Sequence, residues 1–129
     1  MNAVMIKDLK STRVLAVDLR HVLAALGPRA LASDWRVCEV WAEGDAKPEF
    51  RAFDGSQLVP GRGLATLADR VTQIIDGEFS AYELGNASAW VVVEAVDSFY
   101  YTVRSEDSGV LAQIRGAFHD VTDYEHPVA

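Results

Sequence analysis

The sequence of 129 residues contains a single cysteine, Cys38, and therefore lacks the pair that an internal disulfide or a CxxC zinc or redox motif requires. It also has no apolar run of the ~18–20 residues that cross a membrane. Charged residues within 1–10 interrupt the stretch where a secretory signal would have its apolar core. We therefore expect a cytoplasmic protein without a membrane partner.

Basic residues are scarce in the second half of the chain. Residues 65–129 contain three basic and eleven acidic side chains, whereas residues 1–64 contain nine basic and eight acidic ones, and the formal net charge is −7. An acidic half is repelled by nucleic-acid phosphates and attracted to basic protein surfaces. We expect no nucleic-acid partner, and the charge favours a basic protein partner. The alternative is that the acidic surface only maintains solubility.

Sequence motifs of known chemistry are also absent. No serine stands in a G-x-S-x-G context, and Gly61 to Gly63 lacks the strand and the further residues of a dinucleotide or phosphate loop. The cluster of imidazole and carboxylate side chains from His119 to His126 does not have the H-E-x-x-H spacing. We expect no catalytic residue, no metal and no cofactor, and the sequence favours a non-enzymatic protein.

The composition is that of one globular domain. Half of the residues are apolar and 24% are charged, and a chain of this length supports a single core over residues 1–129. Apolar residues from Leu15 to Leu26 recur at helical spacing until Gly27 and Pro28 end the pattern. We expect a helix from about Thr12. The alternative is a shorter helix capped by Asp18 after an extended segment.

Apolar patterns predict four strands. Residues 34–42 alternate clearly, and residues 50–53 suggest a second short strand that closes a hairpin with them. Residues 89–96 are almost all apolar and predict a central strand. Residues 99–104 alternate again, and the two-residue link Asp97-Ser98 predicts an antiparallel hairpin.

Two further helices follow from their apolar spacing. Leu64 to Ile75 repeats at helical spacing and predicts a helix that Gly77 ends. A last helix, with Ser105 as its N-cap, is expected to end near Phe118, and residues 121–124 suggest a short edge strand. The predicted fold is α+β, with a largely antiparallel sheet of four or five strands and about three helices on one face, in the order α-ββ-α-ββ-α(β).

Three short segments stand out within residues 64–121: Ile75-Asp76-Gly77-Glu78-Phe79, the strand that begins at Trp90, and Val96-Asp97-Ser98 followed by aromatic residues. In these segments the chain resembles small bacterial accessory proteins. Some of those proteins are similar in size and acidity to toxin-neutralising immunity proteins. The resemblance implies a protein that binds and masks a partner, and it includes no catalytic motif.

Two functional hypotheses follow from these patterns. The first is a non-enzymatic binding module that masks a basic protein partner through exposed acids. The acids expected to bind this partner are Asp69, Asp76, Glu78 and Glu83. The second is a small-ligand protein or an unrecognised enzyme with a pocket between sheet and helices. The residues expected to bind this ligand are Trp35, Trp41, Glu94 and Tyr100. The aromatic strand face, with Phe50 added, would also allow a homodimer.

Overall fold

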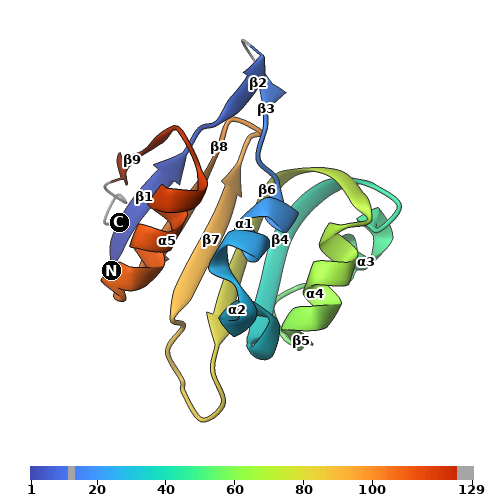
Figure 1. Ribbon diagram of the computed structural model, residues 1–129. Coiled ribbons are helices and arrows are strands. Elements are labelled where there is room, and N and C mark those ends of the chain that lie inside the picture. Colours follow the sequence, from blue (N-terminus) through green and yellow to red (C-terminus); the bar gives the residue numbers. More distant parts are fainter. Residues whose placement is uncertain (12–13, 125–129) are drawn as a thin grey trace.

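Seven antiparallel strands form the main sheet of the computed structural model, which describes residues 1–11 and 14–124 (Figure 1). Their order across the sheet is β5-β4-β6-β7-β8-β1-β9. These strands are β1 (Asn2–Ile6), β4 (Asp34–Gly44), β5 (Leu58–Pro60), β6 (Val71–Tyr82), β7 (Val91–Val96), β8 (Tyr100–Ser105) and β9 (Val121–Tyr124). A separate pair, β2 (Leu9–Ser11) and β3 (Val14–Leu15), projects beyond the sheet. The helices are α1 (Leu19–Leu26), α2 (Pro28–Ala32), α3 (Lys47–Ala52), α4 (Gly61–Ala68) and α5 (Ser108–Ala117).

This architecture corrects the predicted one. The fold is α+β, but the described residues form a seven-stranded sheet, a two-stranded sheet and five helices. The prediction of four or five strands with about three helices, in the order α-ββ-α-ββ-α(β), is wrong. Most of the additional elements are short, such as α2 with five residues and β5 with three, whereas the twelve-residue β6 was predicted in part as a helix. Segments as short as α2 and β5 contain too few positions to show a periodic pattern.

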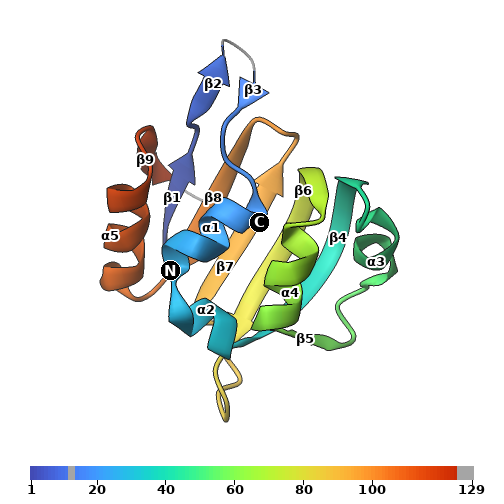
Figure 2. The ribbon, with the colours of Figure 1, turned by 45° about the vertical axis from the view of Figure 1, so that its right-hand side comes forward.

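The helices lie on one face of the sheet. Figures 1 and 2 show α1, α2, α4 and α5 on the same side, while α3 lies beside β4. The core is formed between these helices and the sheet, because α1, α4 and α5 bury several residues each against the inward side chains of the strands, and α2 and α3 add one buried residue each. The largest fully buried side chains include Trp35, Tyr101, Phe50, Phe79, Ile6, Leu19, Leu64, Ile74 and Ile114. No helix of the described residues is long and apolar enough to cross a membrane.

The first helix is shorter than predicted. It begins at Leu19 with Asp18 as its N-cap, and the two-residue strand β3 precedes it. The preference for a helix from about Thr12 is therefore wrong, and Thr12 itself lies outside the described residues. The alternative with Asp18 as the cap is confirmed. Leu15 fits the helical repeat by its spacing alone, and one apolar residue cannot separate a helix turn from a short strand.

The predicted helix from Leu64 to Ile75 is only half correct. Helix α4 ends at Ala68, and β6 starts at Val71. The pairing of β6 with β4 contains register shifts of the kind that β-bulges produce. At each bulge β6 has one extra residue, so the spacing between successive inward-facing residues increases from two positions to three. Val71, Ile74 and Gly77 are therefore all buried. Bulges therefore give this strand the three-residue spacing of a helix.

The predicted strand at residues 50–53 is also wrong, because the segment forms α3 and the residue that follows it. Pro48 lies in the first turn of α3, where its fixed φ is favourable for a helix. Phe50 is completely buried and meets the ring of Phe53 edge-on, with centroids 6.1 Å apart. Two aromatic residues three positions apart are compatible with a helical turn as well as with a short strand, so this pattern alone could not decide between the two.

The predicted hairpin of residues 89–104 is confirmed as β7 and β8. The link is one residue longer than the predicted Asp97-Ser98, because Val96 pairs with Tyr100 and Phe99 also lies in the turn. Asp97 and Ser98 have positive φ values of 51° and 62°, and Phe99 N donates to Val96 O at 2.8 Å. The N-cap of α5 is Asp107 rather than Ser105, and its side chain accepts a hydrogen bond from Gly109 N at 2.8 Å. Ser105 instead donates to the carbonyl oxygen of Trp90 at 2.6 Å. The predicted helix end near residue 118 and the edge strand β9 are confirmed.

Candidate interaction surface

The face of the main sheet opposite the helices is not covered by any helix of the described residues (Figure 2). Strand β7 shows how the two faces separate. Val91, Val93 and Ala95 belong to the main core cluster, whereas Val92, although only 8% exposed, lies outside that cluster and Glu94 is half-buried. Because successive strand side chains point to opposite faces, Val92 and Glu94 share the uncovered side. We call this side the open face.

Strand pairing aligns the side chains of the open face in rows. One row crosses five strands, with each residue opposite the next in register. Its members in order are Cys38, Glu78, Glu94, Thr102 and Met5. The neighbouring row is formed by Arg36, Ser80, Val92, Arg104, Ala3 and Tyr124. The open face thus has a row with two glutamates beside a row with two arginines.

Two carboxylates stand directly opposite each other in the middle of the open face. Glu78 on β6 pairs in register with Glu94 on β7, an arrangement that destabilises a sheet when the charges are alike. Arg104 Nη2 lies 2.9 Å from Glu94 Oε1 and compensates one of the two charges. Asp76 lies two residues before Glu78 and accepts a hydrogen bond from Asp97 N at 2.9 Å. Among the described residues, these acids do not form a group that could hold a metal ion.

The electrostatics at Cys38 reflect these acids. Burial raises the pKa of the Cys38 thiol, and the charges of Glu78 and Glu39 raise that pKa further, against the opposing effect of Arg36. A raised pKa keeps the thiol protonated and unreactive at neutral pH. The raised pKa argues against Cys38 as a nucleophile, and burial contributes more to it than the neighbouring carboxylates do.

Aromatic side chains lie at both ends of this acidic region. Trp41 is 55% exposed, stands opposite Asp76 in register, and donates its indole N–H to Glu43 at 3.1 Å. Tyr100 is half-buried and lies against Tyr124, with ring centroids 6.1 Å apart. Aromatic side chains are enriched at protein interfaces relative to the rest of the surface.

The structure brings together three of the four residues expected to bind a ligand. Trp41, Glu94 and Tyr100 are on the open face, whereas Trp35 is completely buried and donates its indole N–H to Ala30 O at 2.9 Å. Trp35 is a core residue and has no surface to offer a ligand, and the same holds for Phe50. Glu94 lies on the side away from the helices, so a pocket between sheet and helices would not contain it.

The four acids expected to bind a partner are divided. Asp76 and Glu78 lie on the open face. Asp69 follows the end of α4 on the helical side, and Glu83 follows the end of β6 and is paired with Arg29 at 2.8 Å. The four acids therefore do not form one surface, although Glu94 joins the two that share the open face.

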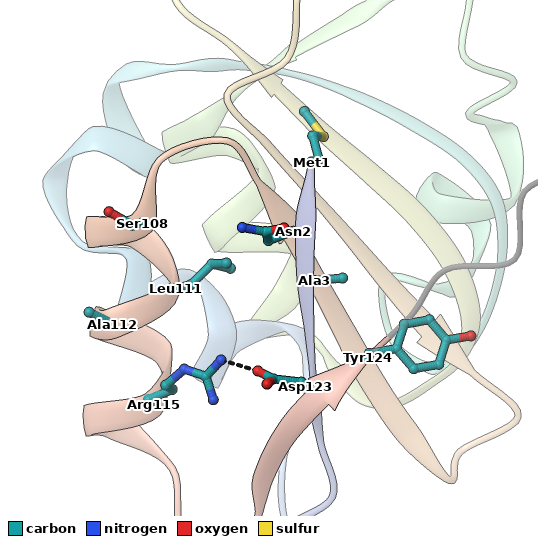
Figure 3. Close-up of a pocket in the computed structure, with 9 residues that line it drawn as sticks. All are labelled: Met1, Asn2, Ala3, Ser108, Leu111, Ala112, Arg115, Asp123 and Tyr124. Atoms are coloured by element: carbon teal, nitrogen blue, oxygen red, sulfur yellow. Dashed lines mark hydrogen bonds and ion pairs between the residues drawn. The ribbon is translucent and has the colours of Figure 1, made fainter.

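A groove of about 890 Å³ lies open between α5, β1 and β9 (Figure 3). Figure 3 shows Leu111 and Ala3 along this groove, with the ion pair of Arg115 and Asp123 across one end and the Tyr124 ring turned away from α5. Its walls carry one neutralised charge pair and no buried polar side chain, so this groove offers little chemistry to a ligand.

Sequence reasoning missed the arginines of the open face. Arg36 and Arg104 occupy strand positions of the same alternation that places Glu78 and Glu94, which is the signal that could have located them. What the sequence could not show is which strands are neighbours. No protein family, characterised protein or solved structure matches this chain significantly.

Proposed function

We propose that this chain is a non-enzymatic binding module that masks a basic surface of a partner protein with its open face. The observation that carries the proposal is the pair of glutamates, Glu78 and Glu94, held opposite each other on a face that no described helix covers. Like charges directly opposite each other in a sheet destabilise the fold. A binding function explains their presence better than solubility alone does. A cationic side chain of a partner would relieve the repulsion.

The neighbouring groups support a protein rather than a small molecule as the occupant. The open face is a broad sheet surface with Trp41 and Tyr100 on opposite sides of the acidic strands. Aromatic anchors beside charged groups provide apolar burial together with charge complementarity. The net charge of −7 would also speed the encounter with a basic partner.

Affinity capture from the source cells tests this proposal when it compares two single charge reversals. Glu78→Lys changes the open face, and Asp69→Lys makes the same change in net charge on the helical side. We expect the wild type and Asp69→Lys to retain the same basic protein at low salt and to release it at high salt. We expect Glu78→Lys to retain much less of it.

Three outcomes contradict the proposal. The first is that no basic protein is retained at low salt, and the second is that both reversals reduce retention equally. The third is that light scattering finds a dimer for the wild type and a monomer for Glu78→Lys, because the open face would then be covered by a second copy of the chain.

A further inference from the structure

The helical side of the molecule has a groove of its own, between α1 and α4, with α2 at one end of it (Figure 2). Its volume is about 350 Å³. Leu23, Pro28, Leu31 and Ala65 are among the residues that line it, and all but two of the lining residues lack a polar side-chain atom. The groove and the open face are on opposite sides of the sheet, so a ligand of the groove would be independent of the function proposed above.

The two charged residues of the groove, Arg20 and Asp69, lie at the end away from α2. Helix α1 ends at α2, because Gly27 is the C-cap of one and the N-cap of the other. Helix α4 begins against α2, where the backbone N–H of Gly61 donates to the carbonyl oxygen of Ser33 at 2.8 Å. Arg20 belongs to the first turn of α1 and Asp69 follows the last residue of α4, so both occupy the far ends of their helices. The groove therefore has two opposite charges at one end and apolar walls towards the other.

Both charged side chains are available to a ligand. Arg20 and Asp69 are exposed, and neither forms an ion pair, with the other or with a third group, within residues 1–11 and 14–124. A guanidinium binds a carboxylate through charge-assisted hydrogen bonds, and a carboxylate binds an ammonium group in the same way. Two opposite charges that line one end of a groove without pairing are complementary to a zwitterion.

The size of the groove favours a small molecule over a partner helix. Helices α1 and α4 have eight residues each, which limits their common wall to about 12 Å. The volume of about 350 Å³ corresponds to roughly twelve water molecules at ~30 Å³ each, which is about the number of non-hydrogen atoms in phenylalanine. It also lies at the lower end of the ~300–1,000 Å³ that is typical of small-molecule sites.

We propose that this groove binds a free α-amino acid with a large apolar side chain. Arg20 holds the carboxylate of the ligand and Asp69 holds its ammonium group, at the end of the groove where both charges lie. The side chain of the ligand extends towards α2 and packs against Leu23, Pro28 and Leu31. Each part of the ligand thus meets a group of the matching chemistry.

Titration of the ¹⁵N-labelled protein by NMR tests this inference with probes that lack one part each. L-phenylalanine and L-leucine have both charges and an apolar side chain, 3-phenylpropionate lacks the ammonium group, 2-phenylethylamine lacks the carboxylate, and L-alanine lacks the large side chain. We expect phenylalanine or leucine to shift the amide signals of Leu23, Leu31 and Ala65 saturably, while Glu78 and Val92 on the open face stay unchanged. The three incomplete probes should bind at least about tenfold more weakly than the better of the two.

Two single variants assign the charges, and because both side chains are exposed we expect both variants to fold. Arg20→Gln and Asp69→Asn should each weaken binding of phenylalanine or leucine at least about fivefold. Arg62→Gln and Asp45→Asn make the same charge changes at exposed positions outside the groove and should leave binding within about twofold.

Three results would overturn the inference. The first is that neither phenylalanine nor leucine shifts the groove signals at about 20 mM. The second is that 3-phenylpropionate or 2-phenylethylamine binds as tightly as phenylalanine, because a single charge would then be sufficient. The third is that the variants of the groove and the control variants weaken binding to the same extent.

Discussion

Strand β4 carries two tryptophans with opposite environments: Trp35 is completely buried, whereas Trp41 is 55% exposed. Strand β8 repeats the contrast, because Tyr101 is 1% exposed and its neighbour Tyr100 is half-buried beside Tyr124. The same strands therefore supply a packed core on one side and the open face on the other. One tryptophan and one tyrosine therefore lie on each face. The residue type alone does not show whether an aromatic side chain belongs to the core or to the open face.

Replacement of the two tryptophans should separate the faces most strongly. Trp35→Ala removes a fully buried ring and its hydrogen bond to Ala30 O, and we expect it to lower the free energy of unfolding by about 3–5 kcal/mol. Trp41→Ala should cost less than about 1 kcal/mol, because most of its ring is already in water. Urea unfolding followed by far-UV circular dichroism measures both values. Equal costs would mean that the open face is also part of a packed core.

The two tyrosines of β8 give a smaller contrast. Tyr101→Phe removes the 2.6 Å hydrogen bond to the Asp18 carboxylate, and we expect a loss of about 1.5–3 kcal/mol. Tyr100→Phe should change the free energy of unfolding by less than about 1 kcal/mol. The same urea experiment decides between them, and a larger loss for Tyr100→Phe would contradict the assigned faces.

Alkaline pH should weaken the fold through Tyr101. An unfolded tyrosine ionises near its usual pKa of about 10, whereas burial and the Asp18 charge hold the pKa of Tyr101 well above that value in the folded protein. Above pH ~10 the unfolded chain therefore binds fewer protons than the folded one, and stability falls as pH rises. The contribution is fully present below that pH. Urea unfolding of the wild type and Tyr101→Phe from neutral to alkaline pH checks this, because the variant should show a shallower fall.

The smallest expected effect is that of Glu78→Gln, and its sign shows whether the paired glutamates destabilise the fold. Glu78→Gln removes one of two like charges in register while Glu94 keeps its ion pair with Arg104, so we expect it to stabilise the fold by about 0.2–0.5 kcal/mol. Asp69→Asn is the control on the helical side and should not stabilise in this way. Thermal unfolding of the three proteins at low salt measures the difference. Destabilisation by Glu78→Gln would show that the paired glutamates are not a cost to the fold.

Local patterns of the sequence predicted the hairpin of β7 and β8 because two strand-like segments are separated by turn-forming residues, although the link contains Phe99 as well as Asp97 and Ser98. They failed at residues 71–75, where register shifts against β4 give a strand the three-residue apolar spacing of a helix. A bulge depends on how a strand pairs with its partner, and the sequence of β6 alone does not indicate it. The first strand, β1, was also missed, although it lies between β8 and β9.

The candidate site was predictable only in part for the same reason. Glu94 was conspicuous as a polar residue within an apolar strand, and Trp41 and Tyr100 were visible as strand aromatics. Their common face, and the position of Glu78 opposite Glu94, depend on the pairing of β6 with β7. Trp35 could not be separated from Trp41, because the bulge between them shifts the alternation of β4.

The association rate of the captured basic protein with the two charge-reversed variants tests the central claim most directly. At low salt we expect Glu78→Lys to slow association at least about fivefold, and Asp69→Lys, with the same change in net charge, to slow it less than about twofold. The difference should shrink at high salt as both rates fall. Equal slowing by the two variants would show that the whole charge of the protein, and not the open face, directs the encounter.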